Sequence, residues 1–252
     1  MGVWLAALSG IIGGGMLLVG AAIAWFVDIP QRVVAAIMAL GAGVLISTLA
    51  YELVEEAAAD GGLVPTVIGF LAGALIYTAA DWLVSRPAKP HSDGVPANAV
   101  RRRSAAKLGG GSGIAIALGA LIDGIPESIV MGLSVIGGGL SIPIVAAVAI
   151  SNVPEGLGST AELKRSGASA RRVFALWGSI AAITVVAAVV GYTAFQSASP
   201  ELTALVTTIA AGGLLAMICS TMIPEAFEEQ HLLTGLWATA GFLGAFVLHE
   251  VS

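Results

Sequence analysis

Long apolar runs separated by short polar stretches make up most of the chain. Because a helix rises about 1.5 Å per residue, about 20 apolar residues are enough to cross a hydrocarbon core of roughly 30 Å. Windows of this length predict eight transmembrane helices, at about residues 3–27, 33–57, 63–84, 113–136, 141–163, 173–195, 202–226 and 232–251. The runs are continuously apolar and do not alternate with a period of two, which disfavours a β-barrel. We therefore expect one all-α transmembrane domain over residues 1–252.

The composition supports an integral membrane protein. Hydrophobic residues make up 57% of the chain and charged residues only 11%, and the mean hydropathy is +0.95. The first apolar run has no basic residues before it and continues to Val27, which predicts a membrane span and not a cleaved signal peptide. A net charge of −5 gives no indication of a nucleic-acid partner. The single cysteine, Cys219, excludes an intramolecular disulfide and a thiol metal cluster.

The basic side chains predict the orientation in the membrane. All 11 of them fall between predicted helices, at Arg32, then at Arg86, Lys89, Arg101, Arg102, Arg103 and Lys107, and then at Lys164, Arg165, Arg171 and Arg172. These segments all lie on one side, which the positive-inside tendency assigns to the cytoplasm. We expect a multi-pass protein of the cell membrane with a cytoplasmic loop at 85–112 and both termini outside.

Two of the predicted helices resemble each other. The stretch AGVLISTLAYELVEEA at 42–57 aligns with AGGLLAMICSTMIPEA at 211–226, and this alignment pairs Glu56 with Glu225. The two helices run in opposite directions under the predicted topology, so they would be related by an axis in the membrane plane. Inverted repeats of this kind are a recurring feature of secondary transporters.

Acidic and polar residues interrupt the fourth and fifth predicted helices, in LIDGIPESIVMGLS and ISNVPEGLGS. Asp123 and Glu127 are four residues apart, as are Ser151 and Glu155, so each pair shares one helix face. Both pairs, together with Asn152, fall in the middle third of their spans. An acidic group there costs roughly 2.5–3.5 kcal/mol to insert. We expect these five residues to face water, protons or a cation.

A proline precedes each of the two glutamates. Pro126 and Pro154 remove backbone donors and free the carbonyl groups of Ile122 and Ile150, which adds oxygen atoms for a cation. Two further residues, Gly124 and Gly156, are expected to let the helices approach closely. A structural reading also stands, in which the prolines only kink their helices and the buried acids are protonated and hydrogen-bonded.

The motifs DGIPES and SNVPEG resemble those of the Zrt/Irt-like (ZIP) family of divalent-metal transporters, which typically read HNxPEG in the fourth span and HExPEG in the fifth. The eight spans, the external termini and the long loop after the third span are also similar to that family. The resemblance implies a three-plus-two-plus-three arrangement of helices with inverted repeats. It also implies that the fourth and fifth spans hold the metal, with the second and seventh spans nearby.

The chain departs from the family pattern at the histidines. Asp123 and Gly124 stand at the first two motif positions of the fourth span, and Ser151 and Asn152 at those of the fifth. Without imidazole the site loses the nitrogen ligands that zinc prefers. Oxygen ligands suit Mg²⁺, Ca²⁺ or Mn²⁺. We expect one principal metal site, formed by Asp123, Glu127, Ser151, Asn152 and Glu155.

The resulting hypothesis is a carrier of divalent cations (zinc, manganese, iron or similar) toward the cytoplasm. The cation is the substrate, no prosthetic group is expected, and a homodimer is compatible with the sequence. The chain has no phosphate-binding GxxxxGK[ST] motif, nucleophile–base pair or HExxH motif, so we expect neither a pump nor an enzyme. Two alternatives remain: a protein on the same scaffold that moves another ion or solute, and a non-transporting membrane scaffold or sensor.

Other polar groups lie at predicted span ends or in loops. We expect surface roles for His91, His231 and His249. One acidic group, Glu225, Glu228 and Glu229, is expected at the cytoplasmic end of the seventh span. The other, Glu52, Glu55, Glu56 and Asp60, is expected outside, where it could attract cations.

Overall fold

Helices form nearly all of the part of the protein that the computed structural model describes, residues 1–84 and 112–251, and no strand occurs there. In chain order the α-helices are α1 (Gly2–Phe26), α2 (Gln31–Thr48), α3 (Glu56–Gly61), α4 (Leu63–Val84), α6 (Ser112–Ser134), α7 (Ile142–Arg165), α8 (Ala170–Phe195), α9 (Pro200–Met217), α10 (Ile223–Gln230) and α11 (Thr234–Val251). Three short segments complete the order: the π-helices η1 (Leu49–Glu55) and η3 (Ile218–Met222) and the 3-10 helix η2 (Val135–Gly137). The predicted cytoplasmic loop 85–112 lies, apart from Ser112, outside the described residues.

Several of the helices can span a bilayer, so the chain is a multi-pass membrane protein. Among the described residues, 6 helical segments are long and apolar enough to cross a membrane: Gly2–Phe26, Gln31–Gly61, Leu63–Leu83, Ile142–Arg165, Ala170–Phe195 and Pro200–Glu229. They match six of the eight predicted spans. The other two predicted spans, 113–136 and 232–251, coincide with helices α6 and α11. That these two also cross the bilayer stays a prediction.

The second and seventh predicted helices are longer than the apolar pattern indicated. They continue past residues 57 and 226 as far as Gly61 and Gln230. The added turns carry acidic side chains, Asp60 in the first and Glu228 and Glu229 in the second, which do not count toward an apolar window. The first of the two helices ends where Gly62 takes a positive φ of 88°, a conformation that favours glycine.

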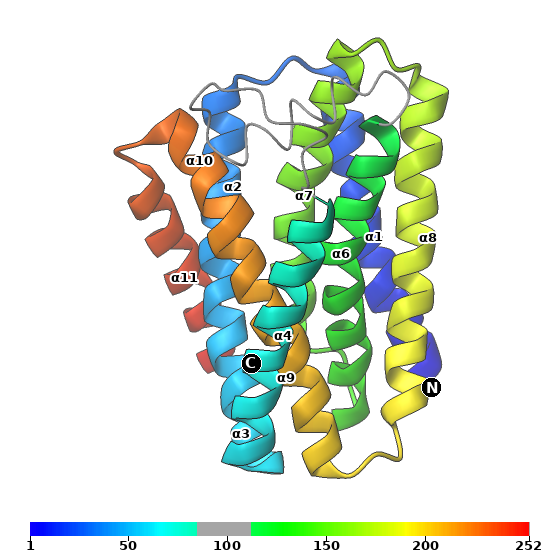
Figure 1. Ribbon diagram of the computed structural model, residues 1–252, viewed down its shortest axis with the longest axis vertical. Coiled ribbons are helices and arrows are strands. Elements are labelled where there is room, and N and C mark those ends of the chain that lie inside the picture. Colours follow the sequence, from blue (N-terminus) through cyan, green and yellow to red (C-terminus); the bar gives the residue numbers. More distant parts are fainter. Residues whose placement is uncertain (85–111, 252) are drawn as a thin grey trace.

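The helices pack in two groups. In one group, α1 packs against α7 and α8, and α6 packs against α8; in the other, α2 packs against α11, and α4 packs against α9. The groups meet where α2 contacts α7 and where α6 contacts α9. Figure 1 shows α8 and α11 at opposite edges of the molecule. The candidate site residues of α6 and α7 therefore belong to one group, which the other group faces.

Glycines bring the backbones of the first group into direct contact. A methyl group at Gly156 of α7 would collide with the carbonyl oxygen of Leu17 on α1, and one at Gly132 of α6 would collide with that of Ala188 on α8. Glycines of α1 and α8 make the reverse contacts, onto the backbones of α7 and α6. Methyl groups at Gly20 and Gly191 would meet the carbonyl oxygens of Val153 and Ile129. The α1–α7 and α6–α8 interfaces thus use the same glycine–carbonyl pattern.

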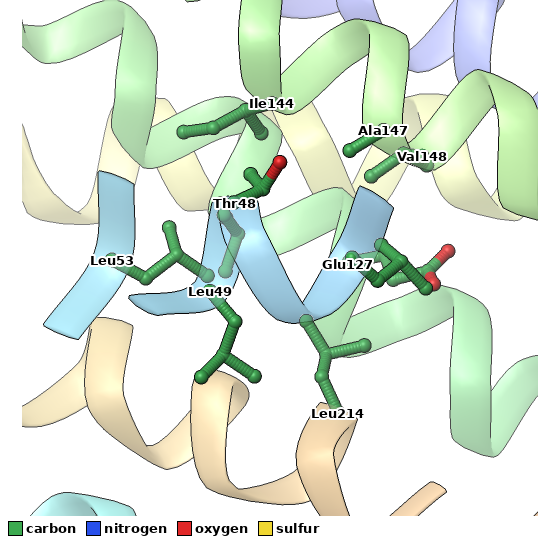
Figure 2. A pocket seen from close by; sticks show the side chains of 10 residues that line it. Thr48, Leu49, Leu53, Glu127, Ile144, Ala147, Val148 and Leu214 are labelled. Atoms are coloured by element: carbon green, nitrogen blue, oxygen red, sulfur yellow. The ribbon is translucent and has the colours of Figure 1, made fainter. Parts of the chain in front are cut away.

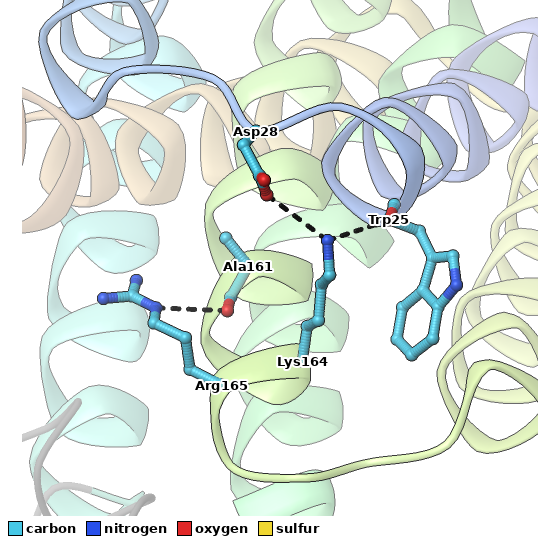
Figure 3. Close-up of polar contacts among 5 residues, drawn as sticks. All are labelled: Trp25, Asp28, Ala161, Lys164 and Arg165. Atoms are coloured by element: carbon cyan, nitrogen blue, oxygen red, sulfur yellow. Dashed lines mark hydrogen bonds and ion pairs between the residues drawn. The ribbon is translucent and has the colours of Figure 1, made fainter.

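Both chain termini lie at the lower end of the molecule in Figure 1, and the turns at 27–30 and 166–169 lie at the upper end. The upper helix ends carry the described basic residues Arg32, Lys164, Arg165, Arg171 and Arg172. In Figure 3, Lys164 joins the end of α7 to the end of α1. Its Nζ donates to the Trp25 carbonyl oxygen at 2.9 Å and lies 3.4 Å from Oδ1 of Asp28.

Candidate functional site

Helix α6 buries both of its predicted metal-binding carboxylates. Asp123 is 9% exposed and Glu127 only 2% exposed. One Glu127 oxygen, Oε2, is fully buried and has no hydrogen-bond partner among the described residues. A buried acid with an unsatisfied oxygen is costly unless the group is protonated or bound to a cation. Pro126 lies inside this helix, one position before Glu127.

Helix α7 supplies the other three predicted residues, and two of them bond to backbone carbonyl groups. Ser151 Oγ donates to the carbonyl oxygen of Val148 at 3.0 Å, a local bond of the kind that serines make inside helices. Asn152 Nδ2 donates to the carbonyl oxygen of Gly13 at 2.9 Å and so ties α7 to α1. Glu155 is partly buried. The asparagine therefore holds two helices together, a role that the sequence did not reveal.

A small cavity lies beside Glu127. It measures about 10 Å³, close to the smallest space that holds one water molecule. Its lining is apolar except for Glu127 and Thr48, and Figure 2 shows these two among leucine, isoleucine, alanine and valine side chains. The hydroxyl groups of Thr48 and its neighbour Ser47 are buried without a hydrogen-bond partner among the described residues. Sequence reasoning missed both hydroxyl groups, although they lie in the repeated stretch of the second span.

The two repeated helices carry π-helical turns at matching positions. The alignment that pairs Glu56 with Glu225 also pairs Leu49 with Ile218, the first residues of η1 and η3. π-helical turns are rare and occur often at functional sites, because the wider turn re-aims side chains and loosens the backbone hydrogen-bond ladder. Both turns lie in the second helix group, which faces α6 and α7.

The five predicted ligands lie on two neighbouring helices, α6 and α7. Within residues 1–84 and 112–251, no group of three or more His, Cys, Asp and Glu side chains is placed to hold a metal ion. Asp123 and Glu127 come from α6 and Glu155 from α7, which are in contact. That these carboxylates share one cation stays a prediction.

Of the two glycines predicted to let helices approach closely, Gly156 does so and Gly124 does not. Gly156 meets the α1 backbone, as expected. Gly124 does not support a close backbone approach, because among the described residues a methyl group there would meet only the side-chain methyl of Thr184 at 3.4 Å, an ordinary contact distance. The expectation for Gly124 was wrong, since a glycine in a sequence does not show which neighbour its helix meets at that turn.

The acidic group predicted at the outer end divides in two. Glu55, Glu56 and Asp60 are exposed, whereas Glu52 is buried. Oε1 of Glu52 lies 2.6 Å from Nδ1 of His249 on α11, and Oε2 of Glu52 accepts a hydrogen bond from Ser141 Oγ at 3.0 Å. His249 thus has a specific carboxylate partner, and the predicted surface role was incomplete because the two residues lie far apart in the sequence.

The acidic group at the other end is mostly solvated. Glu228 and Glu229 are exposed, and Glu225 is partly buried. His231 is exposed and packs edge-on against the ring of Phe227, with ring centroids 5.0 Å apart. His91 lies outside the described residues.

Neither a search of protein-family models nor a search of the curated proteins found a match to this chain.

Proposed function

We propose that the chain carries divalent metal cations across the membrane toward the cytoplasm, as a divergent carrier of the ZIP type. The observation that carries this proposal is the burial of Asp123 and Glu127 in the apolar bundle, with one Glu127 oxygen unsatisfied among the described residues. Evolution tolerates such a costly group mainly where it serves an ion or proton pathway. A dehydrated cation would supply the missing partner.

The packing supports an inverted repeat. If the first three spans correspond to the last three, α2 is equivalent to α9 and α4 to α11. The observed pairs α2–α11 and α9–α4 are then equivalent, and so are the pairs α1–α7 and α8–α6. The matching π-helices and glycine–carbonyl contacts agree with this relation. Together these pairings support the three-plus-two-plus-three arrangement that the resemblance implies, with α6 and α7 as the central pair.

An inverted repeat gives a physical route to transport. The equivalent halves of an inverted repeat can exchange conformations, so that a site carried by one helix group opens first to one side and then to the other as that group moves against the second group. The two helix groups provide surfaces for such a movement, because they meet along α2–α7 and α6–α9. In the proposed cycle the cation binds between the carboxylates of α6 and α7, and the groups slide or rock past each other.

The proposed ligands favour hard cations. The site offers carboxylate oxygens from Asp123, Glu127 and Glu155 and, after a change of hydrogen-bond partners, oxygens of Ser151 and Asn152. Such ligands suit Mn²⁺, Mg²⁺ or Ca²⁺, although carboxylates also bind Zn²⁺. Selectivity would then depend on the ion that is available.

One observation favours a second candidate, transport of protons or another ion on the same scaffold. Ser151 and Asn152 are already bonded to backbone carbonyl groups, and the described residues contain no ready three-ligand group of His, Cys, Asp and Glu. A buried carboxyl group that exchanges a proton needs no such group. A non-transporting scaffold or sensor is the third possibility.

Flux measurements on the purified protein in liposomes test these candidates. We expect uptake of at least one of Mn²⁺, Zn²⁺, Fe²⁺ and Cd²⁺, with a large loss in Glu127→Gln. The matched control is Glu228→Gln, which changes an exposed acid and should transport normally. Proton flux without metal flux would favour the second candidate. The absence of any flux in well-folded protein would contradict transport altogether.

A further inference from the structure

Gly41 of α2 lies at the contact between the two helix groups, beside the proposed ion site. A methyl group placed on Gly41 would lie 3.4 Å from Cα of Ser151, 3.6 Å from the terminal methyl carbon of Met222 and 3.7 Å from the carbonyl oxygen of Ile150. Ser151 and Ile150 belong to α7 of one group, and Met222 is the last residue of η3 in the other. The missing side chain of Gly41 thus leaves a space about as large as a methyl group between the two groups.

The carbonyl group of Ile150 has lost its usual helical partner. Inside an α-helix this oxygen would accept a hydrogen bond from the N–H four residues later, but that residue is Pro154, which has no N–H. Because α2 carries a glycine opposite the oxygen, no side chain of that residue covers it. The oxygen therefore keeps lone pairs for a ligand at Gly41.

Met222 brings a sulphur atom to the same place. It is 8% exposed, and its sulphur is bonded directly to the methyl carbon that lies near Gly41. The sequence repeat pairs Met222 with Leu53, which lines the cavity beside Glu127. A leucine thus occupies the equivalent place in the other half of the repeat, so packing alone does not require a methionine here.

A thioether changes which cations a site prefers. Carboxylate, amide and hydroxyl oxygens are hard ligands that suit Mg²⁺, Ca²⁺ and Mn²⁺. The polarizable sulphur of methionine favours softer ions, among them Zn²⁺ and Cd²⁺. Methionine also fills irregular gaps in cores, and a test of the ligand role has to separate it from packing.

We propose that Met222 and the carbonyl oxygen of Ile150 are further ligands of the proposed ion site, which they complete around Gly41, and that the thioether makes the site prefer softer divalent cations. The inference rests on the proposed function, because it concerns the cation that Ser151 and Glu155 would bind. A bare divalent cation is smaller than a methyl group and lies about 2.0–2.6 Å from its oxygen ligands, so the surrounding atoms have to close in by about 1 Å. The bound ion would join α7 to η3.

Binding of Cd²⁺ and Mn²⁺ to the purified protein in lipid nanodiscs tests the thioether without any transport. The background is Cys219→Ser, which removes the single thiol of the chain. Met222→Leu nearly conserves side-chain volume, and it should weaken Cd²⁺ binding roughly tenfold and Mn²⁺ binding less than about twofold. Met131→Leu is the control, because Met131 is buried with its methyl group against Gly13 of α1, within one helix group. It should change neither affinity.

X-ray absorption spectroscopy at the cadmium edge identifies the ligand atoms directly. Bound Cd²⁺ should have sulphur and oxygen neighbours in the Cys219→Ser background and in Met131→Leu, but no sulphur neighbour in Met222→Leu. Oxygen neighbours alone in all three proteins would overturn the thioether ligand. An unchanged preference between Cd²⁺ and Mn²⁺ in Met222→Leu would overturn it as well.

Gly41→Ala tests the space itself. The new methyl group would meet its neighbours at ordinary contact distances, so the unfolding midpoint should not change. It would nevertheless fill the place of the ion, and binding of both cations should fall at least about tenfold. Gly213→Ala is the matched control, because its nearest described contacts are also ordinary, with the Gly73 carbonyl oxygen at 3.7 Å and Cβ of Tyr77 at 3.8 Å. Wild-type affinities in Gly41→Ala would place the ion elsewhere and overturn the inference.

The outcomes distinguish this inference from the proposed function. A wild-type protein that binds neither cation would contradict both. Transport of cations by a protein whose bound Cd²⁺ has only oxygen neighbours would keep the proposed function and remove Met222 from the site. A sulphur neighbour that is lost in Met222→Leu, in a protein that moves no cation in liposomes, would confirm the ligand and contradict transport.

Discussion

Among single residues, Glu127 is the one on which the proposed function depends most. Its carboxylate is buried in the α6 helix, and one of its oxygens lacks a hydrogen-bond partner among the described residues. A neutral amide is cheaper to bury than an unpaired carboxylate, so substitution should preserve the fold. The same substitution removes a charge that a cation would need. We therefore expect a neutral amide at this position to reduce transport without reducing the stability of the fold.

Glu127→Gln and Glu155→Gln should each reduce metal transport by at least about tenfold, because a cation in the membrane core would lose one formal counter-charge. Their effects should be strongly non-additive, as expected for two residues that share one ligand. Liposome flux of each variant measures the loss of transport, and the thermal unfolding midpoint shows whether the fold is preserved. Wild-type flux in both variants would make the carboxylates structural.

Asp123→His restores the imidazole that the ZIP motif has at this position. A nitrogen ligand should shift the preference of the site toward Zn²⁺ relative to Mn²⁺. Competition of the two ions in binding calorimetry measures the shift. An unchanged preference would place Asp123 outside the proposed ligand set.

Asn152 allows a structural role to be separated from a ligand role. If its bond to the Gly13 carbonyl group is its main function, Asn152→Ala should lower the free energy of unfolding by about 0.5–1.5 kcal/mol. Thr239→Val, which removes an exposed bond within α11, is the matched control and should have little effect. A loss of metal affinity at unchanged stability would instead identify Asn152 as a ligand.

At the scale of helices, glycine contacts determine how closely α7 and α6 pack on their neighbours. Gly156→Ala and Gly132→Ala should each cost about 1–3 kcal/mol, because the new methyl group would meet a backbone carbonyl oxygen that cannot rotate away. Gly15→Ala and Gly178→Ala are controls, since among the described residues no atom outside the glycine's own helical turns lies within 4 Å of a methyl group there. Equal unfolding midpoints for all four variants would show that the helices can separate without cost.

Much of the helix pattern could be predicted from the sequence, because apolar runs of span length leave few alternatives to a helix in lipid. The π-helices could not, since a widened turn leaves no mark in an apolar run. The pairing of His249 with Glu52 was hidden for a different reason, namely that the packing of α11 on α2 brings together residues far apart in the chain.

The arrangement of the candidate site was also hidden in the sequence, because it depends on contacts between helices. The two Pro–Glu motifs look like copies of each other, at Glu127 and Glu155. The glycine contacts, however, equate Gly132 with Gly156 and therefore Glu127 with Ser151. The motifs are thus offset by about one helical turn within the packing pattern. The residue types and the helix faces they share could be predicted from the sequence. The one-turn offset between the two motifs follows only from the contacts between helices.

At the scale of the whole molecule, orientation decides which end is the entrance. The turns at 27–30 and 166–169 carry basic residues at or beside them and lie at the end opposite the two termini, so the positive-inside tendency predicts that these turns face the cytoplasm. In a Cys219→Ser background, Ser169→Cys should be inaccessible to an impermeant maleimide on intact cells, and Gly139→Cys should react. Both positions are exposed, and a Cβ atom at Gly139 would meet no described atom within 4 Å apart from those of its chain neighbours. Labelling in the opposite sense would reverse entrance and exit.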